Sequence, residues 1–244
     1  MEGFHKPTAG ANDRAPAVQE MFDRISPRYD VANRVLSLGL DQSWRRKALA
    51  ALGDRVEGVM VDLCTGTMDL VPMILDRGAT TVHAIDFSAG MLEVGQAKIP
   101  NGAPVQTHQA DARDLPLEDG SVDGIIIAFG IRNVPGFEDA LAECARVLRP
   151  GGRLVVLDFF QPDGFLARGL QDSYNRFIVP MVGGWITGTR QAYAYLFESI
   201  DAFASRADFE AALAAEGFEV SGVDMFPPVA SMVVGTRLQV THDA

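Results

Sequence analysis

Val59-Met60-Val61-Asp62-Leu63-Cys64-Thr65-Gly66-Thr67-Met68-Asp69 is the stretch that decides the fold. A short apolar run leads into a turn at Gly66, and about twenty residues further on, a spacing typical of nucleotide sites, a second apolar run ends in Asp86. A strand, a glycine turn and a carboxylate at the tip of the next strand are how an α/β sheet holds an adenosine cofactor. Gly66 lets backbone N–H groups approach the ligand because it has no Cβ. Asp86 can accept hydrogen bonds from two vicinal ribose hydroxyls.

The glycine pattern separates the adenosine cofactors from one another. The dinucleotide fingerprint G-x-G-x-x-G would place further glycines where this chain has Met68 and Val71. Their absence favours S-adenosylmethionine over NAD. An NAD-dependent reductase is the competing interpretation, and it would need those glycines and usually a Tyr/Lys pair or a His as acid. A cofactor-binding protein without catalysis is a third, and it would keep Asp86 but need no open pocket.

Composition limits the classes of partner. The chain has 244 residues, a net charge of −11 and a pI near 4.7, so it has no excess of Lys and Arg to neutralise the phosphates of a nucleic acid. Its length and 48% hydrophobic content suit a single domain over 1–244. The two cysteines, Cys64 and Cys144, fit a reducing cytosol. The four histidines lack ligand spacing, and we therefore predict no metal site.

Localisation is predicted from what the sequence lacks. Neither a signal peptide nor an apolar run of about 18 residues is present, which favours a soluble, cytoplasmic protein. Arg45-Arg46-Lys47 is interpreted as a solvated helix face. Contact of this run with phospholipid headgroups is the alternative, which would make the protein peripheral to the inner face of the membrane. The oligomeric state is left open, with a homodimer as one alternative.

Periodicity predicts an alternation of strands and helices. Residues 1–13 are expected to be disordered, 14–52 to form a helical cap and 163–200, rich in aromatic residues, to form a helical insertion. A hairpin near the C-terminus should add an antiparallel strand. The fold is therefore predicted as Rossmann-like α/β, with a doubly wound, mostly parallel sheet of seven strands. The predicted strands are 59–63, 81–86, 105–109, 122–129, 153–159, 218–226 and 230–238, and the helices between them 69–77, 88–98, 137–149 and 207–216.

Two acidic positions at strand ends are candidates for cofactor binding. Asp62 ends the first strand and either bonds the amino group of the cofactor or holds the glycine turn. Asp111 follows the third strand, where it can accept from an adenine amino group while Ala112 leaves room for the ring. Capping of the Arg113-Asp114 turn is the alternative for Asp111.

A second informative stretch is Phe129-Gly130-Ile131-Arg132-Asn133-Val134, which follows an apolar strand. Ligands of open α/β sheets bind outside the carboxyl ends of the strands. Arg132 and Asn133 are therefore expected where a substrate meets the cofactor. The alternative is a surface salt bridge for Arg132 and a turn for Asn133.

These residues resemble the ubiquinone/menaquinone biosynthesis C-methyltransferases, which methylate the ring of a prenylated hydroquinone with S-adenosylmethionine. The resemblance extends from Met21 to Arg237 and includes stretches that generic methyltransferases lack. Those stretches are Met21-Phe22-Asp23, Tyr29-Asp30, Asn33, Ser37-Leu38-Gly39, Trp44-Arg45, Phe129-Gly130-Ile131-Arg132-Asn133-Val134, Arg146-Val147-Leu148-Arg149-Pro150-Gly151-Gly152 and Tyr193-Ala194-Tyr195-Leu196-Phe197-Glu198-Ser199-Ile200.

The resemblance implies cofactor contacts at Thr67, Asp86, Asp111 and Ala112, and a pocket closed by the N-terminal helices and the 163–200 insertion. Arg132 is expected to stabilise the ionised acceptor rather than the fold, while Asn133 orients its second oxygen. The complete set of predicted site residues is, for the cofactor, Tyr29, Asp62, Gly66, Thr67, Asp86, Phe87, Asp111 and Ala112, and, for the acceptor and catalysis, Phe129, Arg132, Asn133 and Tyr195.

The chain departs from the family pattern at several positions. The family usually has Gly where this chain has Met68, Ser where it has Ala128, Glu-Phe-Ser where it has Asp158-Phe159-Phe160, and commonly His where Asp41 stands. Loss of the hydroxyl at Ala128 removes a contact worth about 1 kcal/mol. A diverged methyltransferase acting on another phenolic ring is therefore the alternative function.

Overall fold

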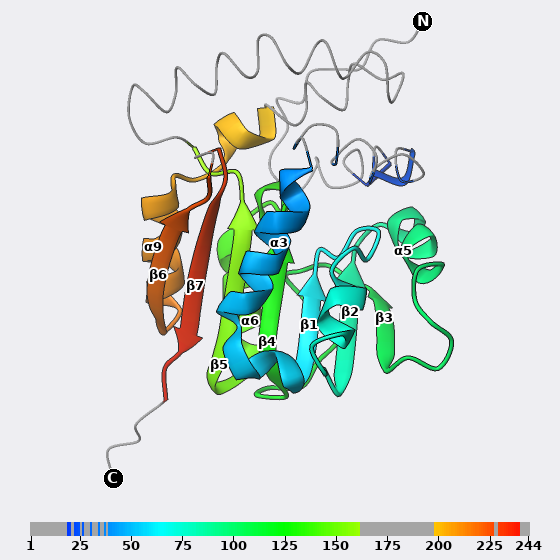
Figure 1. Cartoon of the computed structure of the whole chain (residues 1–244). Coiled ribbons are helices and arrows are strands. Elements are labelled where there is room, and N and C mark those ends of the chain that lie inside the picture. Colours follow the sequence, from blue (N-terminus) through cyan, green and yellow to red (C-terminus); the bar gives the residue numbers. More distant parts are fainter. Residues whose placement is uncertain are drawn as a thin grey trace, which may run out of the picture.

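The computed structural model describes residues 19–20, 22–24, 26, 30, 34, 37, 39–161, 198–226 and 229–239. Within these residues, seven strands form one sheet with helices packed on its two faces (Figure 1). The helices are α3 (Leu40–Ala51), α4 (Val71–Leu75), α5 (Ala89–Gln96), α6 (Phe137–Val147) and α9 (Arg206–Ala215), with 3₁₀ helices η2 (Gly53–Glu57) and η3 (Ile131–Asn133). The strands are β1 (Val59–Leu63), β2 (Thr81–Asp86), β3 (Val105–Gln109), β4 (Val122–Ala128), β5 (Leu148–Asp158), β6 (Phe218–Asp224) and β7 (Ser231–Arg237).

The order of the strands locates the ligand site. It is β3-β2-β1-β4-β5-β7-β6, in which β1 to β5 run parallel and β7 runs antiparallel to both of its neighbours. The order changes direction between β1 and β4, and at such a switch point a crevice opens outside the carboxyl ends of the strands. The predicted fold, with its antiparallel C-terminal strand, is confirmed.

Alternation along the strands divides the core between the two faces of the sheet. Val61 and Leu63 of β1 pack with α6 and α9 on one face, while Met60 packs with α3 and α4 on the other. The same period of two runs along β4, where Ile125 and Ile127 join the first cluster and Ile126 the second. Central parallel strands are buried on both sides, which explains their nearly continuous apolar runs.

The predicted bounds of β1, β2 and β3 agree with the structure, the other limits mostly differ by one or two residues, and the start of β5 was wrong by five. The helix predicted over 137–149 ends at Val147, and β5 begins at Leu148 instead of at 153. Leu148 pairs with Val122, and the next pairs start at Arg153 after a shift of register. Pro150 and Gly151, at φ +78°, therefore interrupt the ladder within β5 instead of stopping the helix.

α3 crosses the sheet in front of β4 and β5 (Figure 1). Trp44, Ala48 and Leu49 recur at helical spacing and are buried beneath it. The interpretation of Arg45-Arg46-Lys47 as a solvated face was wrong for its first member, because Arg45 is buried while Arg46 and Lys47 are exposed.

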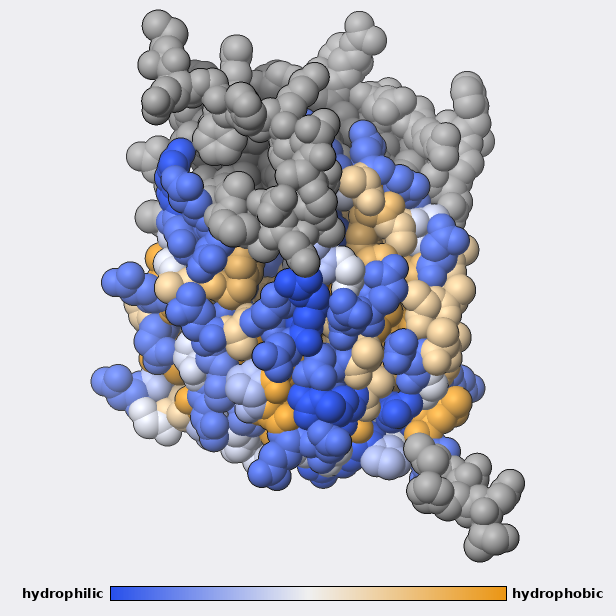
Figure 2. Space-filling view, turned by 180° about the vertical axis from the view of Figure 1, so that it is seen from behind, coloured by the Kyte–Doolittle hydropathy of each residue, from blue (hydrophilic) through white to orange (hydrophobic). Residues whose placement is uncertain are grey.

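The face of the molecule opposite α3 is largely hydrophilic in its described part, with hydrophobic side chains scattered among polar ones (Figure 2). Large hydrophobic side chains that are exposed in the described chain belong to the C-terminal hairpin and its flanks: Val223, Phe226 and Leu238. In the part of the chain that the structure describes, no helix has both the length and the apolar character needed to cross a bilayer.

Candidate active site

Asp62 stabilises the glycine turn after β1. This carboxylate accepts a hydrogen bond from Thr65 Oγ1 at 2.5 Å and is 2% exposed. Burial raises the pKa of Asp62 to about 7, against the lowering effects of the Thr65 hydroxyl and of Arg45. Of the two interpretations of Asp62, the structure therefore favours the one in which it holds the turn, and Asp62 is absent from the lining of the pocket described below.

Asp86 lies at the tip of β2, as predicted. Its Oδ2 accepts the N–H of Gly66 at 2.8 Å and its Oδ1 accepts the N–H of Ser88 at 2.9 Å, so one carboxylate joins the two loops that follow β1 and β2. Its two oxygens together have about four acceptor sites, and the N–H groups of Gly66, Ser88 and Phe87 leave part of this capacity for a ligand. Burial raises the pKa of Asp86, while the Ser88 and Gly66 N–H groups lower it.

A pocket of about 740 Å³, counted to its open mouth, lies against this carboxylate. Of the predicted residues, those that line it are Gly66, Asp86, Phe87, Asp111, Ala112, Phe129 and Asn133. Its other lining residues are Phe22, Leu63, Cys64, Ile85, Met91, Ala110, Arg113, Gly130, Val134 and Pro135.

Asp111 and Ala112 form one end of the pocket. The carboxylate of Asp111 is bound by Arg113, at 2.7 Å from NH2 and 3.0 Å from Nε, and it also accepts the Arg113 N–H at 2.9 Å. These bonds lower the pKa of Asp111. The turn role that the sequence offered as the alternative is therefore present, and it leaves Asp111 half-exposed and ionised at the edge of the pocket.

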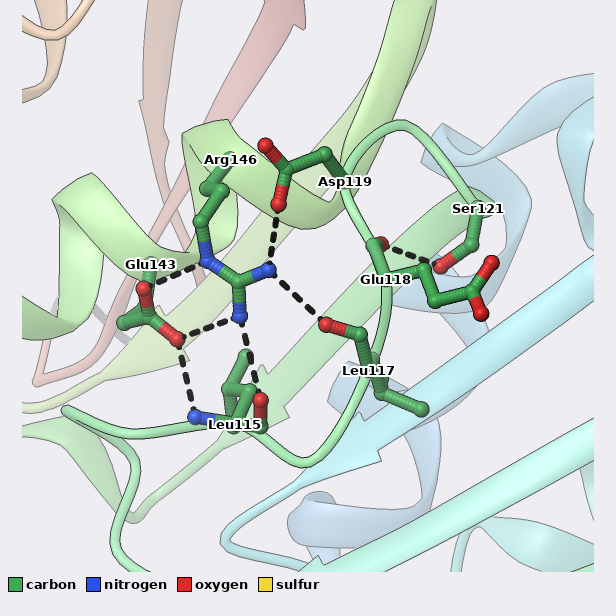
Figure 3. A network of polar contacts seen from close by, with 7 residues as sticks. All are labelled: Leu115, Leu117, Glu118, Asp119, Ser121, Glu143 and Arg146. Carbon is green, nitrogen blue, oxygen red and sulfur yellow. Dashed lines mark hydrogen bonds and ion pairs between the residues drawn. The ribbon is translucent and has the colours of Figure 1, made fainter.

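Arg146 stabilises the loop after β3 (Figure 3). It lies in the last turn of α6 and is the first residue of the stretch Arg146–Gly152 that contributes to the family resemblance. Its guanidinium donates to the carbonyls of Leu115 and Leu117 and pairs with Glu143 and Asp119. Glu143 in turn accepts the N–H of Leu115 at 2.8 Å, and the pKa of Glu143 is lowered mainly by Arg146. This motif residue thus fixes the segment that directly follows Asp111.

The loop after β4 forms the opposite wall. Phe129 has φ +66°, and its N–H donates to the carbonyl of Leu157 near the carboxyl end of β5. Gly130 must be glycine here, because a Cβ would lie 2.3 Å from the Cβ of Cys64. The loops after β1 and β4 therefore approach each other as closely as their backbones permit.

Arg132 is engaged in a buried ion pair. Its NH1 lies 2.7 Å from Oδ1 of Asp158 and 2.6 Å from the carbonyl of Phe129, with side-chain exposures of 6% for Arg132 and 0% for Asp158. Removing one partner of a buried pair is strongly destabilising. Arg132 therefore supports the fold as well, contrary to the expectation that it would not. Its role toward the acceptor stays a prediction.

Asn133 lines the pocket, and its Oδ1 is buried with no hydrogen-bond partner among the described residues. A buried acceptor left without a donor is costly. Ligand donors are the natural means of satisfying such an atom where it borders a pocket. Asn133 is thus the predicted acceptor-side residue whose geometry leaves it available to a ligand.

The described N-terminal residues hold the cofactor loops at two points. Asp23 accepts from Ser88 Oγ at 2.5 Å and from the Gly90 N–H at 3.1 Å. Asp30 accepts from Thr67 Oγ1 and pairs with Lys98 Nζ at 2.5 Å.

Lys98 also reaches Asp69 at 2.6 Å, so the N-terminal segment is joined to the glycine turn through charge. Asp69 precedes α4, whose N-cap is Leu70. Thr67 contacts Asp30 and is absent from the pocket lining. Tyr29 and Tyr195 lie outside the described residues.

The residues present fit an adenosine cofactor. Gly66, at φ +55°, donates its N–H to Asp86, and both residues line the pocket. No group of three or more potential metal ligands occurs within the described part of the chain.

Comparison with known proteins agrees with this geometry. Residues 8–232 match the ubiE/COQ5 methyltransferase family. The chain belongs to this family. It is therefore a methyltransferase, with S-adenosylmethionine as its cofactor.

Two curated relatives and one solved structure illustrate the similarity. The chain is 42% identical to the demethylmenaquinone methyltransferase of Thermus thermophilus, over 89% of this chain and 100% of the relative. It is 40% identical to the ubiquinone/menaquinone biosynthesis C-methyltransferase UbiE of Geotalea daltonii, over 85% and 90%. A crystal structure of a SAM-dependent methyltransferase from Aquifex aeolicus has the same fold, with a TM-score of 0.60, 18% identity, and coverage of 91% and 98%.

Sequence reasoning missed several residues that shape the site. Lys98 had no recognisable signal, because its two carboxylate partners are 68 and 29 residues away in the chain. Asp23 and Asp30 belonged to stretches shared with the family, which could have marked them as positioning residues. Asp158 was noted only as a departure from the family pattern, yet it is the counter-ion of Arg132.

Proposed function

We propose that this enzyme transfers the methyl group of S-adenosylmethionine to a ring carbon of a prenylated hydroquinone, such as demethylmenaquinol, in quinone biosynthesis. The names of its relatives supply the substrate class. The observation that carries the proposal is the pocket itself, which has Asp86 at one wall and the unsatisfied Oδ1 of Asn133 at another. A cofactor-binding protein without catalysis would not need a buried acceptor atom beside an open pocket.

The acceptor ring must be ionised before its carbon can attack. A phenol has a pKa near 10, so forming the anion at pH 7 costs roughly 4 kcal/mol. The cofactor would supply an electrophilic methyl group, and in-line positioning of the nucleophile at about 3–3.5 Å supplies much of the acceleration. Transfer releases S-adenosylhomocysteine, and the ring carbon that accepts the methyl group gives up its proton to water. The protein must therefore hold the ring rigidly and lower the cost of its ionisation.

Named residues can perform these tasks. We assign the ribose to Asp86, the adenine to Asp111, Ala112 and Phe87, and one wall of the acceptor site to Phe129. Asn133 Oδ1 accepts a hydrogen bond from a hydroxyl of the quinol. This hydroxyl is the second oxygen of the ring, and Arg132 acts as a cation near the ionised oxygen, although its charge is shared with Asp158.

The remaining predictions concern parts of the chain that lie largely outside the described residues. We assign Tyr29 to the cofactor and Tyr195 to the acceptor, and the N-terminal cap with the 163–200 insertion to the walls of an apolar tunnel. A prenyl tail would gain about 0.8 kcal/mol per buried CH₂ there. Such a substrate resides in the bilayer, and the enzyme would meet it as a peripheral protein at the inner face of the membrane, with a homodimer as one form of the assembly.

The test compares methylation of a demethylmenaquinol-like substrate with and without dithionite, and with a full or truncated tail. Activity should require the reductant, because only the hydroquinone has an ionisable oxygen that raises electron density on the ring carbon. Equal methylation of the oxidised quinone would refute the chemistry. Indifference to the tail would instead favour the alternative, a phenolic acceptor of specialised metabolism.

A matched pair of variants tests the role of Asn133. Asn133→Leu keeps the approximate volume but removes the acceptor atom, and it should lower the rate of methylation while leaving the affinity for S-adenosylhomocysteine unchanged. Asn133→Asp keeps an acceptor and should retain more activity. Equal loss of cofactor affinity in both variants would place Asn133 in the cofactor site instead.

A further inference from the structure

Arg45 is a buried cation without a counter-ion in ion-pair distance among the described residues. It lies on α3, is 7% exposed, and its Nε has no hydrogen-bond partner there. Removing an ion from water costs several kcal/mol unless a partner compensates. Arg132, the other buried arginine near the pocket, has such a partner in Asp158, whereas Arg45 does not.

The surroundings of Arg45 are aromatic and acidic, but the acids are already occupied. Its Cζ lies 5.4 Å from the centroid of the Phe129 ring, and Phe129 lines the pocket. Asp41, one turn earlier, accepts from Ser37 at 2.8 Å and from Gln42 at 3.1 Å.

Asp62 is near enough for its charge to be felt by Arg45, yet it is bonded to Thr65 and lies outside ion-pair distance. Because burial raises the pKa of Asp62 to about 7, this carboxyl carries only part of a negative charge at neutral pH. A cation over an aromatic ring gains modest energy, which offsets little of the cost of burying a guanidinium.

Arg45 is absent from the lining of the pocket, but it contacts the site at two points. Its guanidinium lies over the ring of Phe129, which lines the pocket, and its charge lowers the pKa of Asp62, which holds the glycine turn. The lining residues Ile85, Asp86, Asp111 and Ala112 mark the adenosine end of the pocket. The methionine end of the cofactor and the acceptor ring must both extend beyond that end.

We propose that Arg45 is the anion-binding residue of this site, and that its guanidinium pairs with an anionic oxygen of a bound ligand. Two sources share this chemistry: the carboxylate at the methionine end of the cofactor, and the ionised oxygen of the acceptor. The second source rests on the proposed function. A guanidinium is suited to either, since it remains charged and presents several donors in a plane.

The experiment compares Arg45→Met with the matched control Arg46→Met, which removes the same charge from an exposed position of the same helix. Arg45→Lys tests whether a positive charge alone restores the effect. Each protein is titrated by calorimetry with S-adenosylhomocysteine, which carries the carboxylate, and with 5′-methylthioadenosine, which lacks it. Thermal unfolding and the pH dependence of kcat/KM with a reduced quinol are measured on the same samples.

Pairing with the cofactor predicts that Arg45→Met weakens S-adenosylhomocysteine binding at least tenfold, leaves 5′-methylthioadenosine binding unchanged, and is partly restored in Arg45→Lys. Pairing with the acceptor predicts unchanged binding of both ligands, together with a pH profile displaced to higher pH. In either case Arg45→Met should unfold at the parent's temperature or above, because an unpaired buried charge has been replaced by an apolar side chain.

Three results would overturn the proposal. They are a marked loss of stability in Arg45→Met, an equal loss of affinity for both ligands, or behaviour identical to Arg46→Met in every measurement. The calorimetric comparison does not use the acceptor, so a parent enzyme inactive on quinols would refute the proposed function without affecting that arm. In that case, unchanged binding of both ligands would overturn the proposal for Arg45 as well.

Discussion

Replacing Asp62 by Asn should make the stability of the protein less dependent on pH. Asp62 is 2% exposed, and burial raises its pKa from 3.8 to about 7. The folded state therefore holds a proton that the unfolded state has already released between these two values. More protons are bound in the folded state, so stability declines as pH rises through this window and levels off above it.

The magnitude follows from the same two values. A rise from 3.8 to about 7 corresponds to roughly 4 kcal/mol of cost for the ionised form. Asn removes that cost and can still accept from Thr65 Oγ1, but its amide N–H groups lose about 1–3 kcal/mol if they find no partner. Asp62→Asn should thus stabilise the protein by roughly 1–3 kcal/mol above pH 7 and destabilise it below about pH 4.

The assay is urea unfolding of the parent and of Asp62→Asn across this pH range. The difference between the two proteins cancels the contributions of other titrating groups, and it should change by at most about 1.4 kcal/mol per pH unit. Asp123→Asn is a matched control, because it makes the same change of side chain at a carboxylate that is paired with Arg149 at the start of β4. A difference between the parent and Asp62→Asn that stays constant with pH would refute the argument, since it would mean that Asp62 is ionised throughout.

Three further predictions concern the cofactor loops. Asp86→Ala should weaken S-adenosylhomocysteine binding by roughly 1.5–3 kcal/mol, since charge-assisted hydrogen bonds are lost, and unchanged affinity in calorimetry would contradict it. Gly95→Ala places a Cβ 2.6 Å from Cγ of Met68. The free energy of unfolding, measured with urea, should fall by roughly 1–3 kcal/mol, and an unchanged value would mean that α5 can shift without cost. Lys98→Met leaves Asp30 without its cation and should weaken cofactor binding at low salt; a deficit that persists at high salt would argue against an electrostatic cause.

The sequence predicted the strands well because their signals are local. β1 and β2 are apolar runs bounded by a turn and an acid, so their limits can be read directly. The start of β5 could not be read in this way, because it depends on the pairing of Leu148 with Val122 in β4 across an interrupted ladder. Pro150 and Gly151 carry the local signal of a helix stop, and tertiary pairing places them inside a strand instead.

The site divides in the same way. Positions at strand tips, such as Asp86, Asp111 and Asn133, could be placed at the pocket because topology alone brings strand ends together. What each side chain contacts could not be predicted when the partner is distant in sequence. Arg132 and Asp158 are 26 residues apart, and no spacing rule connects them.

One departure from the family pattern places a residue other than glycine in a strained backbone conformation. Among the described residues, three other than glycine have positive φ: Cys64 at 55°, Met68 at 58° and Phe129 at 66°. All three flank the pocket or its glycine turn, and each costs of order 1–3 kcal/mol relative to an unstrained backbone. Met68 stands where the family usually has glycine, so its strain is a cost specific to this chain.

Packing at Met68 supplies the compensation. Its side chain is fully buried, and Gly95 leaves it room, since a Cβ there would lie 2.6 Å from its Cγ. Burying a methionine contributes about 1.5–3 kcal/mol, comparable with the strain of a left-handed backbone. The same turn is also held by two hydrogen bonds, from Thr65 to Asp62 and from the N–H of Gly66 to Asp86. The cofactor loop thus keeps the conformation that its ligand needs with a bulky residue in the place of glycine. Packing of Met68 and the hydrogen bonds of the loop together outweigh the backbone strain at this position.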